Sequence, residues 1–382
     1  MTRIPLGKHA FAGAAVALAM VTTPPSHGAA PLTLADLDGL MLPVGNLGNP
    51  GNAVGQESYG SVDYAYSIAK YQITQGQYAE FLNTVAHDDP KELWHSSLAG
   101  TPITKYLTTI TRTGDSGSYQ YAADPNFTNR PVVYLRLSTM KRFCNWLTNG
   151  ANASASTETG VYDMNLGAGA PRNLAIGGVS TVYALPTVDE WYKAAYYDPA
   201  KPGGAGYWTY STSGTHHAGG DTISINYANY QSPKGTYTYR NTHGPGWGNG
   251  FYLLNEVDFY ELYPSAYGAV DMTGNAMEWT ETYAGEVEKI IPIQPGRPED
   301  PPPPPTPPTY IPSYHVCGGT FTWDESQLAS TGAVGRIDDE DGYYYGFRVV
   351  ALAPQPVPEP STYALIGGVG ALALVLLRRR RR

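Results

Sequence analysis

Glycine and proline interrupt this chain so often that little room remains for long helices. The 382 residues include 43 glycines and 32 prolines, and tyrosine is also abundant at 31. Glycine and proline both end regular structure, whereas tyrosine packs well on the pleated surface of a sheet. The sequence therefore predicts a loop-rich domain with short elements and much irregular backbone.

Charge and cysteine content narrow the possible partners and chemistry. The formal net charge is -9 and the isoelectric point is near 5.4. A broad basic surface for nucleic acid is therefore missing, and we expect no nucleic-acid partner. The two cysteines, Cys144 and Cys317, are too few for a disulfide scaffold. Whether they form a single bridge is left open by the sequence.

Three segments carry the signals of a helix. Each begins at a residue typical of helix N-caps and continues with apolar residues on one face. The three starts are Thr74, Ser138 and Thr187, and the first and last have Gln77 and Glu190 three residues further on, which completes a capping box. In the second segment Cys144 falls on the apolar face, where it is most simply a small buried side chain.

Other segments predict strands and loops. Alternating apolar residues from Val62 to Ile68 indicate a half-buried strand, and residues 343–352 are expected to form the closing strand of the domain. The stretch from about residue 203 to 250 predicts loops and short strands. The proline-rich insertion, residues 294–312, contains a polyproline II spacer, because the proline ring fixes φ and removes amide donors. A stiff surface insertion is the favoured interpretation of this spacer over a recognition ligand.

The N-terminus has the pattern of a secretory signal peptide. Basic residues precede an apolar run, and small residues near Ala30 offer a cleavage site. We therefore expect residues 1–30 to direct export and residues 31–353 to form the exported domain.

The C-terminal tail, residues 354–382, also addresses the chain to a membrane. Pro358, Glu359 and Pro360 precede an apolar stretch, residues 361–377, and the chain then ends in five arginines. The apolar stretch is only just long enough to cross a hydrocarbon core, and the arginines would stay on the cytoplasmic side. A permanent membrane anchor is one interpretation of this pattern.

The three parts of this tail also resemble, in order, the PEP-CTERM sorting signal, which bacterial exosortases recognise and process. The resemblance implies that exosortase is a partner. It also implies a location in the cell envelope or outside the cell, with the tail as a transient membrane anchor. Proteins with this signal are associated as a class with extracellular polysaccharide, so a polysaccharide or an envelope protein is the expected partner.

Five segments resemble, in the same order, the formylglycine-generating enzyme family, also called the sulfatase-modifying factor family. They are Tyr66–Ala86, Arg130–Gly150, Ala184–Ala195, Ala266–Thr282, and Cys317–Ser330 together with Gly346–Val350. The resemblance covers nearly the whole domain, with core motifs over residues 62–350. It implies a loop-rich, C-type-lectin-like α+β fold with short strands and about three helices.

At the catalytic positions of that family, the sequence departs from the pattern. The resemblance implies a copper-dependent oxidation of a partner's cysteine, carried out by two cysteines that follow a Gly-Gly-Ser motif. Those positions fall on Trp323 and about Leu328, and neither side chain can bind copper or exchange with a thiol. We therefore expect no copper and no catalytic residue. An alternative is a formylglycine-generating-type oxidoreductase of altered mechanism, which would act on a protein cysteine through Cys317.

The same resemblance implies calcium as a structural cofactor. In the family, the Gly-Asn-x-x-Glu-Trp turn surrounds a Ca²⁺ ion with two side chains and two backbone carbonyls. Carried over to this sequence, these ligands are the side chains of Asp271 and Glu278 and the carbonyls of Gly274 and Ala276. A second family site would begin with the side chain of Asn229 and the carbonyl of Tyr230. Such hard oxygen ligands are those that Ca²⁺ prefers.

Together these features favour a non-catalytic, exported module that binds carbohydrate or protein. Trp323, Tyr343, Tyr344 and Tyr345 are its expected ligand surface, because flat aromatic rings make good contacts in a cleft. Packing in the core is the competing interpretation of these rings. A matrix component without a specific ligand is a third possibility.

Overall fold

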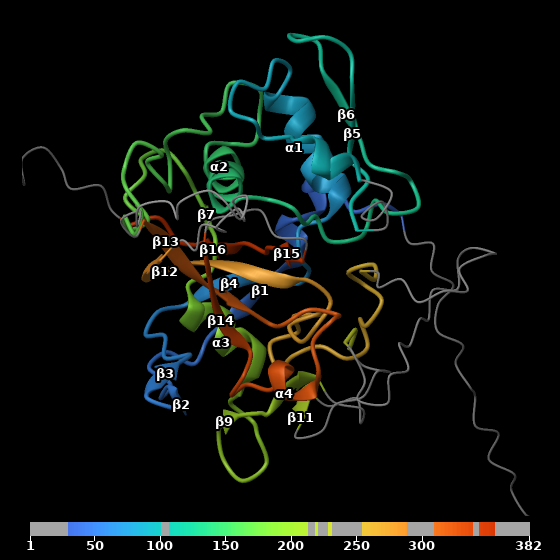
Figure 1. The fold of residues 1–382 in the computed structure, drawn as a ribbon. Coiled ribbons are helices and arrows are strands. Elements are labelled where there is room, and N and C mark those ends of the chain that lie inside the picture. The colour runs from blue at the N-terminus through green and yellow to red at the C-terminus, as the bar shows by residue number, and fades with distance from the viewer. Residues whose placement is uncertain are drawn as a thin grey trace, which may run out of the picture. The chain divides into compact units, whose positions relative to one another are not determined.

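The computed structural model in Figure 1 describes residues 30–100, 107–212, 218–220, 228–230, 254–288, 309–338 and 344–355. Residues 1–29, where a signal peptide is predicted, most of the proline-rich insertion, Tyr343 and residues 356–382 lie outside the described residues. Predictions that fall on those segments stay predictions.

Two four-stranded sheets form the centre of the domain. The first has the order β1-β4-β16-β7, in which all neighbours are antiparallel. Its strands are β1 (Met41–Val44), β4 (Tyr66–Ala69), β7 (Val182–Ala184) and β16 (Val350–Leu352). Segments far apart in the sequence thus lie side by side in this sheet.

The second sheet has the order β14-β13-β12-β15. Its strands are β12 (Met277–Glu288), β13 (Tyr310–Cys317), β14 (Val334–Asp338) and β15 (Tyr345–Gly346). The strands β12, β13 and β14 pair antiparallel, whereas β15 runs parallel to β12. The pairing of β12 with β13 has register shifts between Trp279 and Gly285.

Within the described residues, four α-helices and several small elements complete an α+β fold, which confirms the expected fold class. The helices are α1 (Gln75–Val85), α2 (Leu137–Thr148), α3 (Val188–Tyr196) and the short α4 (Glu325–Leu328). Three 3-10 turns are η1 (Leu34–Asp36), η2 (Asp38–Leu40) and η3 (Ser96–Ala99). Four two-stranded sheets pair β2 (Asn52–Val54) with β3 (Glu57–Tyr59), β5 (Thr111–Thr113) with β6 (Gln120–Ala122), β8 (Tyr197–Asp198) with β9 (Gly206–Tyr207), and β10 (Tyr210–Thr212) with β11 (Ala218–Gly220).

The three predicted helices are confirmed, and two of them begin as the capping signals indicate. The Thr74 hydroxyl accepts from the Gln77 amide, and the Gln77 side chain accepts from the Thr74 amide. Thr187 and Glu190 repeat this exchange at the start of α3. Each capping box satisfies amides that have no acceptor within the helix. The helix α2 begins one residue before Ser138 and has no capping side chain.

The two predicted strands are only partly correct. The first, Val62–Ile68, is limited to β4, and residues 62–65 are irregular. The Val62 carbonyl accepts from the Gly48 amide and the Lys193 ammonium. The predicted closing strand, 343–352, is divided into β15 and β16, which belong to different sheets. Between them Arg348 turns its side chain towards the second sheet, as described below.

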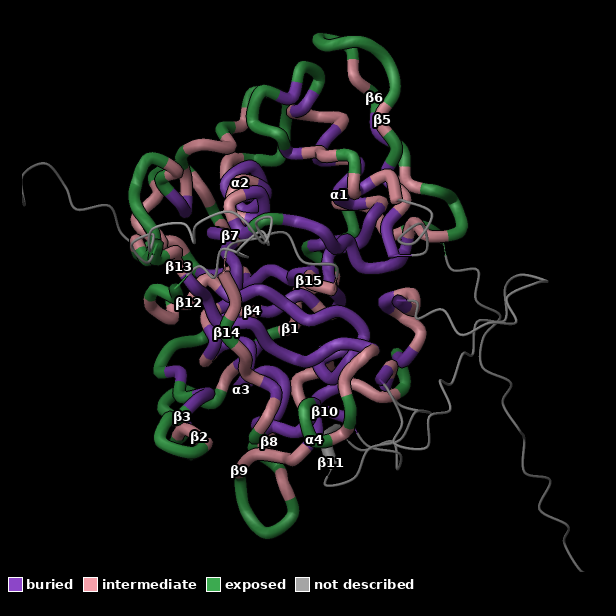
Figure 2. Tube along the Cα trace, in the orientation of Figure 1, coloured by how far each residue is buried: buried purple, intermediate pink, exposed green. Residues whose placement is uncertain are grey.

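Aromatic side chains fill the interior between the helices and the first sheet. The Phe143 ring lies 5.2 Å from that of Phe81 and 5.4 Å from that of Phe347, both edge to face. Cys144, the next residue on α2, is fully buried in the same cluster, as predicted. Figure 2 shows the buried residues gathered along the central strands and the inward faces of the helices.

Candidate functional site

The buried carboxylate of Glu278 is the best-connected group of the family-like motifs. Its Oε2 accepts from Arg348 Nε at 2.6 Å and from Trp191 Nε1 at 2.8 Å. Its Oε1 accepts from Arg348 Nη2 at 2.7 Å and from Gln72 Nε2 at 2.9 Å. A carboxylate has about four lone-pair positions, so these four donors fill it.

Arg348 uses its remaining donors on backbone carbonyls. Its Nη1 donates to the carbonyls of Ala69 and Lys70, and its Nη2 donates to that of Val270. Arg348 and Glu278 are both fully buried. The bidentate pair therefore joins the segment between β15 and β16 to the start of β12, and the same guanidinium also reaches the end of β4.

The contacts of Glu278 do not fit the predicted calcium site. Asp271 is buried in the left-handed backbone region, with φ 57°, and its Oδ2 accepts from Asn275 Nδ2 at 3.2 Å. Its Oδ1 has no hydrogen bond within the described part of the chain, and burial raises the pKa of this carboxyl to about 8. The Ala276 carbonyl accepts from Gln72. Because four other donors occupy Glu278, a Ca²⁺ ion bound by this set of four would have to displace some of them. Calcium at these ligands stays a prediction.

The residues of the second predicted calcium site lie against the same turn. The Asn229 carbonyl accepts from the Asn275 amide at 2.9 Å, and Asn229 Nδ2 donates to Asn275 Oδ1 at 3.2 Å. A Cβ on Gly274 would collide with the Asn229 carbonyl, so glycine is required there. The Tyr230 hydroxyl donates to Glu325. The described residues contain no group of three or more His, Cys, Asp or Glu side chains placed to hold a metal.

The two cysteines are free thiols in separate elements. Cys144 lies on α2 and Cys317 ends β13, both fully buried and unpaired by a disulfide. Burial raises the pKa of each thiol well above its ordinary value. At the two positions that the family comparison assigned to thiols, Leu328 is fully buried in a small apolar cluster and Trp323 packs against that cluster.

The rings of the predicted ligand surface pack against other aromatic side chains. Tyr344 stands edge-on to Phe321, with ring centroids 5.4 Å apart, and Tyr345 lies 5.7 Å from Trp279. All of these rings except Tyr343, which is outside the described residues, are thus supported by the core. They do not line the cavity described next.

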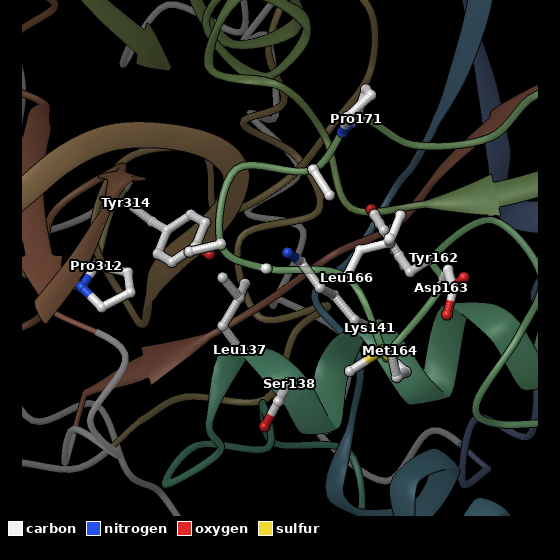
Figure 3. A pocket seen from close by; sticks show the side chains of 13 residues that line it. Leu137, Ser138, Lys141, Tyr162, Asp163, Met164, Leu166, Pro171, Pro312 and Tyr314 are labelled. Atoms are coloured by element: carbon white, nitrogen blue, oxygen red, sulfur yellow. The ribbon is translucent and has the colours of Figure 1, made fainter.

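A cavity of about 270 Å³ opens between the start of α2, residues 162–171 and β13 (Figure 3). The Lys141 side chain rises from α2 into the space between Tyr314 and Tyr162. Its ammonium lies 5.1 Å from the Tyr314 ring centroid and 5.3 Å from that of Tyr162. This cavity is not predictable from the sequence, because residues 162–171 have no periodic pattern that would place them beside β13.

A buried ionic network supports the wall of the cavity. The Tyr162 hydroxyl donates to Glu281 Oε2 at 2.5 Å, and burial raises the pKa of Glu281 to about 7. Arg172 lies 3.3 Å from Glu281 and makes two hydrogen bonds to Glu190, at 2.6 and 3.0 Å. Glu281 and Arg172 therefore hold the Tyr162 side chain in place on the side away from the cavity, so this wall is ordered without a ligand.

Comparisons with known sequences identify two parts of the chain. Residues 46–353 match the sulfatase-modifying factor enzyme 1-like domain, and residues 356–382 match the PEP-CTERM protein-sorting motif. A search of curated proteins found no match. No helix among the described residues has the length and apolar character that a membrane span requires.

Three solved structures are similar to this chain at low sequence identity. CarF is 18% identical, with a TM-score of 0.43, and the match covers 82% of this chain and 98% of that one. Treponema denticola variable protein 1 is 16% identical, with a TM-score of 0.39 and coverage of 82% and 95%. PvdO from Pseudomonas aeruginosa is 15% identical, with a TM-score of 0.38 and coverage of 81% and 91%.

Proposed function

Because this chain belongs to the sulfatase-modifying factor enzyme 1-like domain family, we propose that it is a non-catalytic member that binds carbohydrate at the cell envelope. Its PEP-CTERM motif is a sorting signal for exosortase and implies export to the envelope. We further propose that the tail anchors the chain in the membrane until exosortase processes it.

The placement of the thiols is the observation that carries the non-catalytic part of the proposal. The thiolate is the reactive form of cysteine and the form that holds copper. Cys144 and Cys317 are both buried, with pKa values raised by burial, and they lie on different elements. Apolar packing by Trp323 and Leu328 occupies the segment from which thiols would act in this family.

The cavity between α2 and β13 supports the binding part of the proposal. Small-ligand sites are concave, largely preformed and lined by aromatic and apolar groups with a few polar ones. Tyr162, Tyr314 and Lys141 provide this combination on elements held by the core. A protein partner would instead use a broader surface, since specific protein interfaces bury roughly 800 Å² on each side.

The test uses the purified full-length chain in two assays. We expect no formylglycine when a cysteine-containing peptide is incubated with the chain, copper and dioxygen, and we expect binding to at least one class of oligosaccharide on a glycan array. Cys317→Ala and Cys144→Ala, two buried thiol variants in different elements, should leave that binding unchanged. Formation of formylglycine that is lost in Cys317→Ala would instead establish an oxidoreductase of altered mechanism. Capture of an envelope protein without any glycan binding would replace carbohydrate by protein as the ligand.

A further inference from the structure

We propose that the cavity at the start of α2 binds a carboxylate-bearing sugar, such as a uronic acid unit of an acidic polysaccharide. This inference rests on the proposed carbohydrate-binding function and assigns both the site and the class of ligand. The cavity residues that carry the argument are Lys141, Tyr162, Tyr314, Ser138 and Asp163.

The size of the cavity favours one sugar unit. Sites for drug-sized ligands measure roughly 300–1,000 Å³, and this cavity measures about 270 Å³. It is therefore suited to a single ring whose neighbours in a longer chain extend beyond the opening.

The charge at the centre of the cavity favours a carboxylate. The Lys141 ammonium lies over two tyrosine rings, at 5.1 and 5.3 Å from their centroids, and such rings attract and orient a cation. Leu137 and Ser138, the first two residues of α2, also line the cavity. A helix N-terminus carries partial positive charge, and the N-cap residue Arg136 provides no capping hydrogen bond. Both features favour an anion beside Lys141.

The remaining cavity residues fit the hydroxyls and the apolar face of a sugar. The Ser138 hydroxyl can donate or accept a hydrogen bond. Asp163 is oriented by two hydrogen bonds from Asn165, both of which use Oδ1, so among the described residues Oδ2 can accept from a sugar hydroxyl. A simple inorganic anion would not need these groups, and a neutral sugar would not need Lys141.

The tyrosine rings are held in place without a ligand. Tyr162 is fixed by its hydrogen bond to Glu281. Tyr314 stands edge-on to Tyr283, with ring centroids 5.7 Å apart. A site of this kind loses little conformational freedom on binding, which favours affinity.

The experiment is calorimetric titration of the full-length chain with oligogalacturonate and, separately, with the neutral oligogalactose of the same length. We expect the acidic sugar to bind more tightly than the neutral sugar. We also expect its affinity to fall as the salt concentration is raised, because salt screens exposed charges. Lys141→Met should weaken oligogalacturonate binding by about tenfold or more, since it removes a charge-assisted hydrogen bond. Ser138→Ala, which removes only the hydroxyl, should weaken it less.

Lys201→Met is the matched control. The Lys201 ammonium also lies over an aromatic ring, 4.3 Å from that of Trp208, but it does not line the cavity. The Lys201→Met variant should bind oligogalacturonate with the same affinity as the unmodified chain. Equal binding by Lys141→Met, or equal binding of the neutral sugar, would overturn this inference while leaving carbohydrate binding intact. Failure to bind any sugar on the array would overturn both.

Discussion

Replacing Glu278 by glutamine should destabilise the domain more than any ordinary surface change. The substitution keeps the shape of the side chain but leaves the fully buried Arg348 guanidinium without its counter-charge. Breaking a buried ion pair by removing one partner costs about 3–5 kcal/mol. The cost should be at the upper end, because Trp191 and Gln72 also donate to this carboxylate.

Thermal and urea unfolding followed by circular dichroism would measure this effect. With an unfolding entropy of roughly 2.1 cal/mol/K per residue, one kcal/mol corresponds to roughly 1.5 °C for a domain as large as residues 31–353, so the unfolding midpoint should fall by roughly 4–8 °C. The control is Glu261→Gln, whose half-exposed carboxylate pairs with Lys70 at the surface and should cost less than about 1 kcal/mol. The double variant Glu278→Leu/Arg348→Met should recover part of the loss, because it leaves no buried charge unpaired. If Glu278→Gln costs no more than Glu261→Gln, the argument that this pair holds the two sheets is refuted.

Three further predictions concern ionisation and metal. The folded pKa of Glu281, about 7, lies above its unfolded value, so its contribution to stability is lost as pH rises from about 4.5 to 7. In Glu281→Gln the unfolding free energy should therefore depend less on pH over that window. An unchanged slope of unfolding free energy against pH would contradict this. Glu158 has its pKa lowered to about 2, chiefly by a hydrogen bond from Arg142, so its contribution is present above about 4.5 and lost as pH falls towards 2; acid titration of Glu158→Gln should lack that loss. Chelation by EDTA should leave the thermal midpoint unchanged if the donors of Glu278 exclude an ion, because they fill its lone pairs. A lower midpoint that Ca²⁺ restores would instead confirm the predicted calcium site.

Local signals predicted the helices well because each depends on residues close together in the chain. Thr74 with Gln77, and Thr187 with Glu190, satisfy their own helix starts, so neighbours alone define these boundaries. The segment 343–352 was predicted less well, because its division into two strands depends on Arg348 meeting Glu278, which is 70 residues away in sequence. Apolar patterning carries no information about such a pair.

The candidate site was harder to predict than the fold for the same reason. In the sequence of α2, Lys141 looks like an ordinary polar residue of the helix. Its aromatic neighbours, Tyr162 and Tyr314, come from segments that are distant in sequence. Conversely, the aromatic residues singled out from the sequence, such as Tyr344 and Tyr345, are half-buried against the core. A ring available for binding and a ring needed for packing have the same sequence signature.

The order of strands in the first sheet constrains when this domain can finish folding. The strand between β4 and β7 is β16, which is the last strand of the domain in sequence. Synthesis proceeds from the N-terminus, so β4 and β7 cannot pair with β16 until nearly the entire chain has been made. The sorting motif follows directly, at residues 356–382. A product that ends before residue 350 therefore lacks both the sorting motif and β16, and it leaves β4 and β7 without the strand that joins them in the sheet.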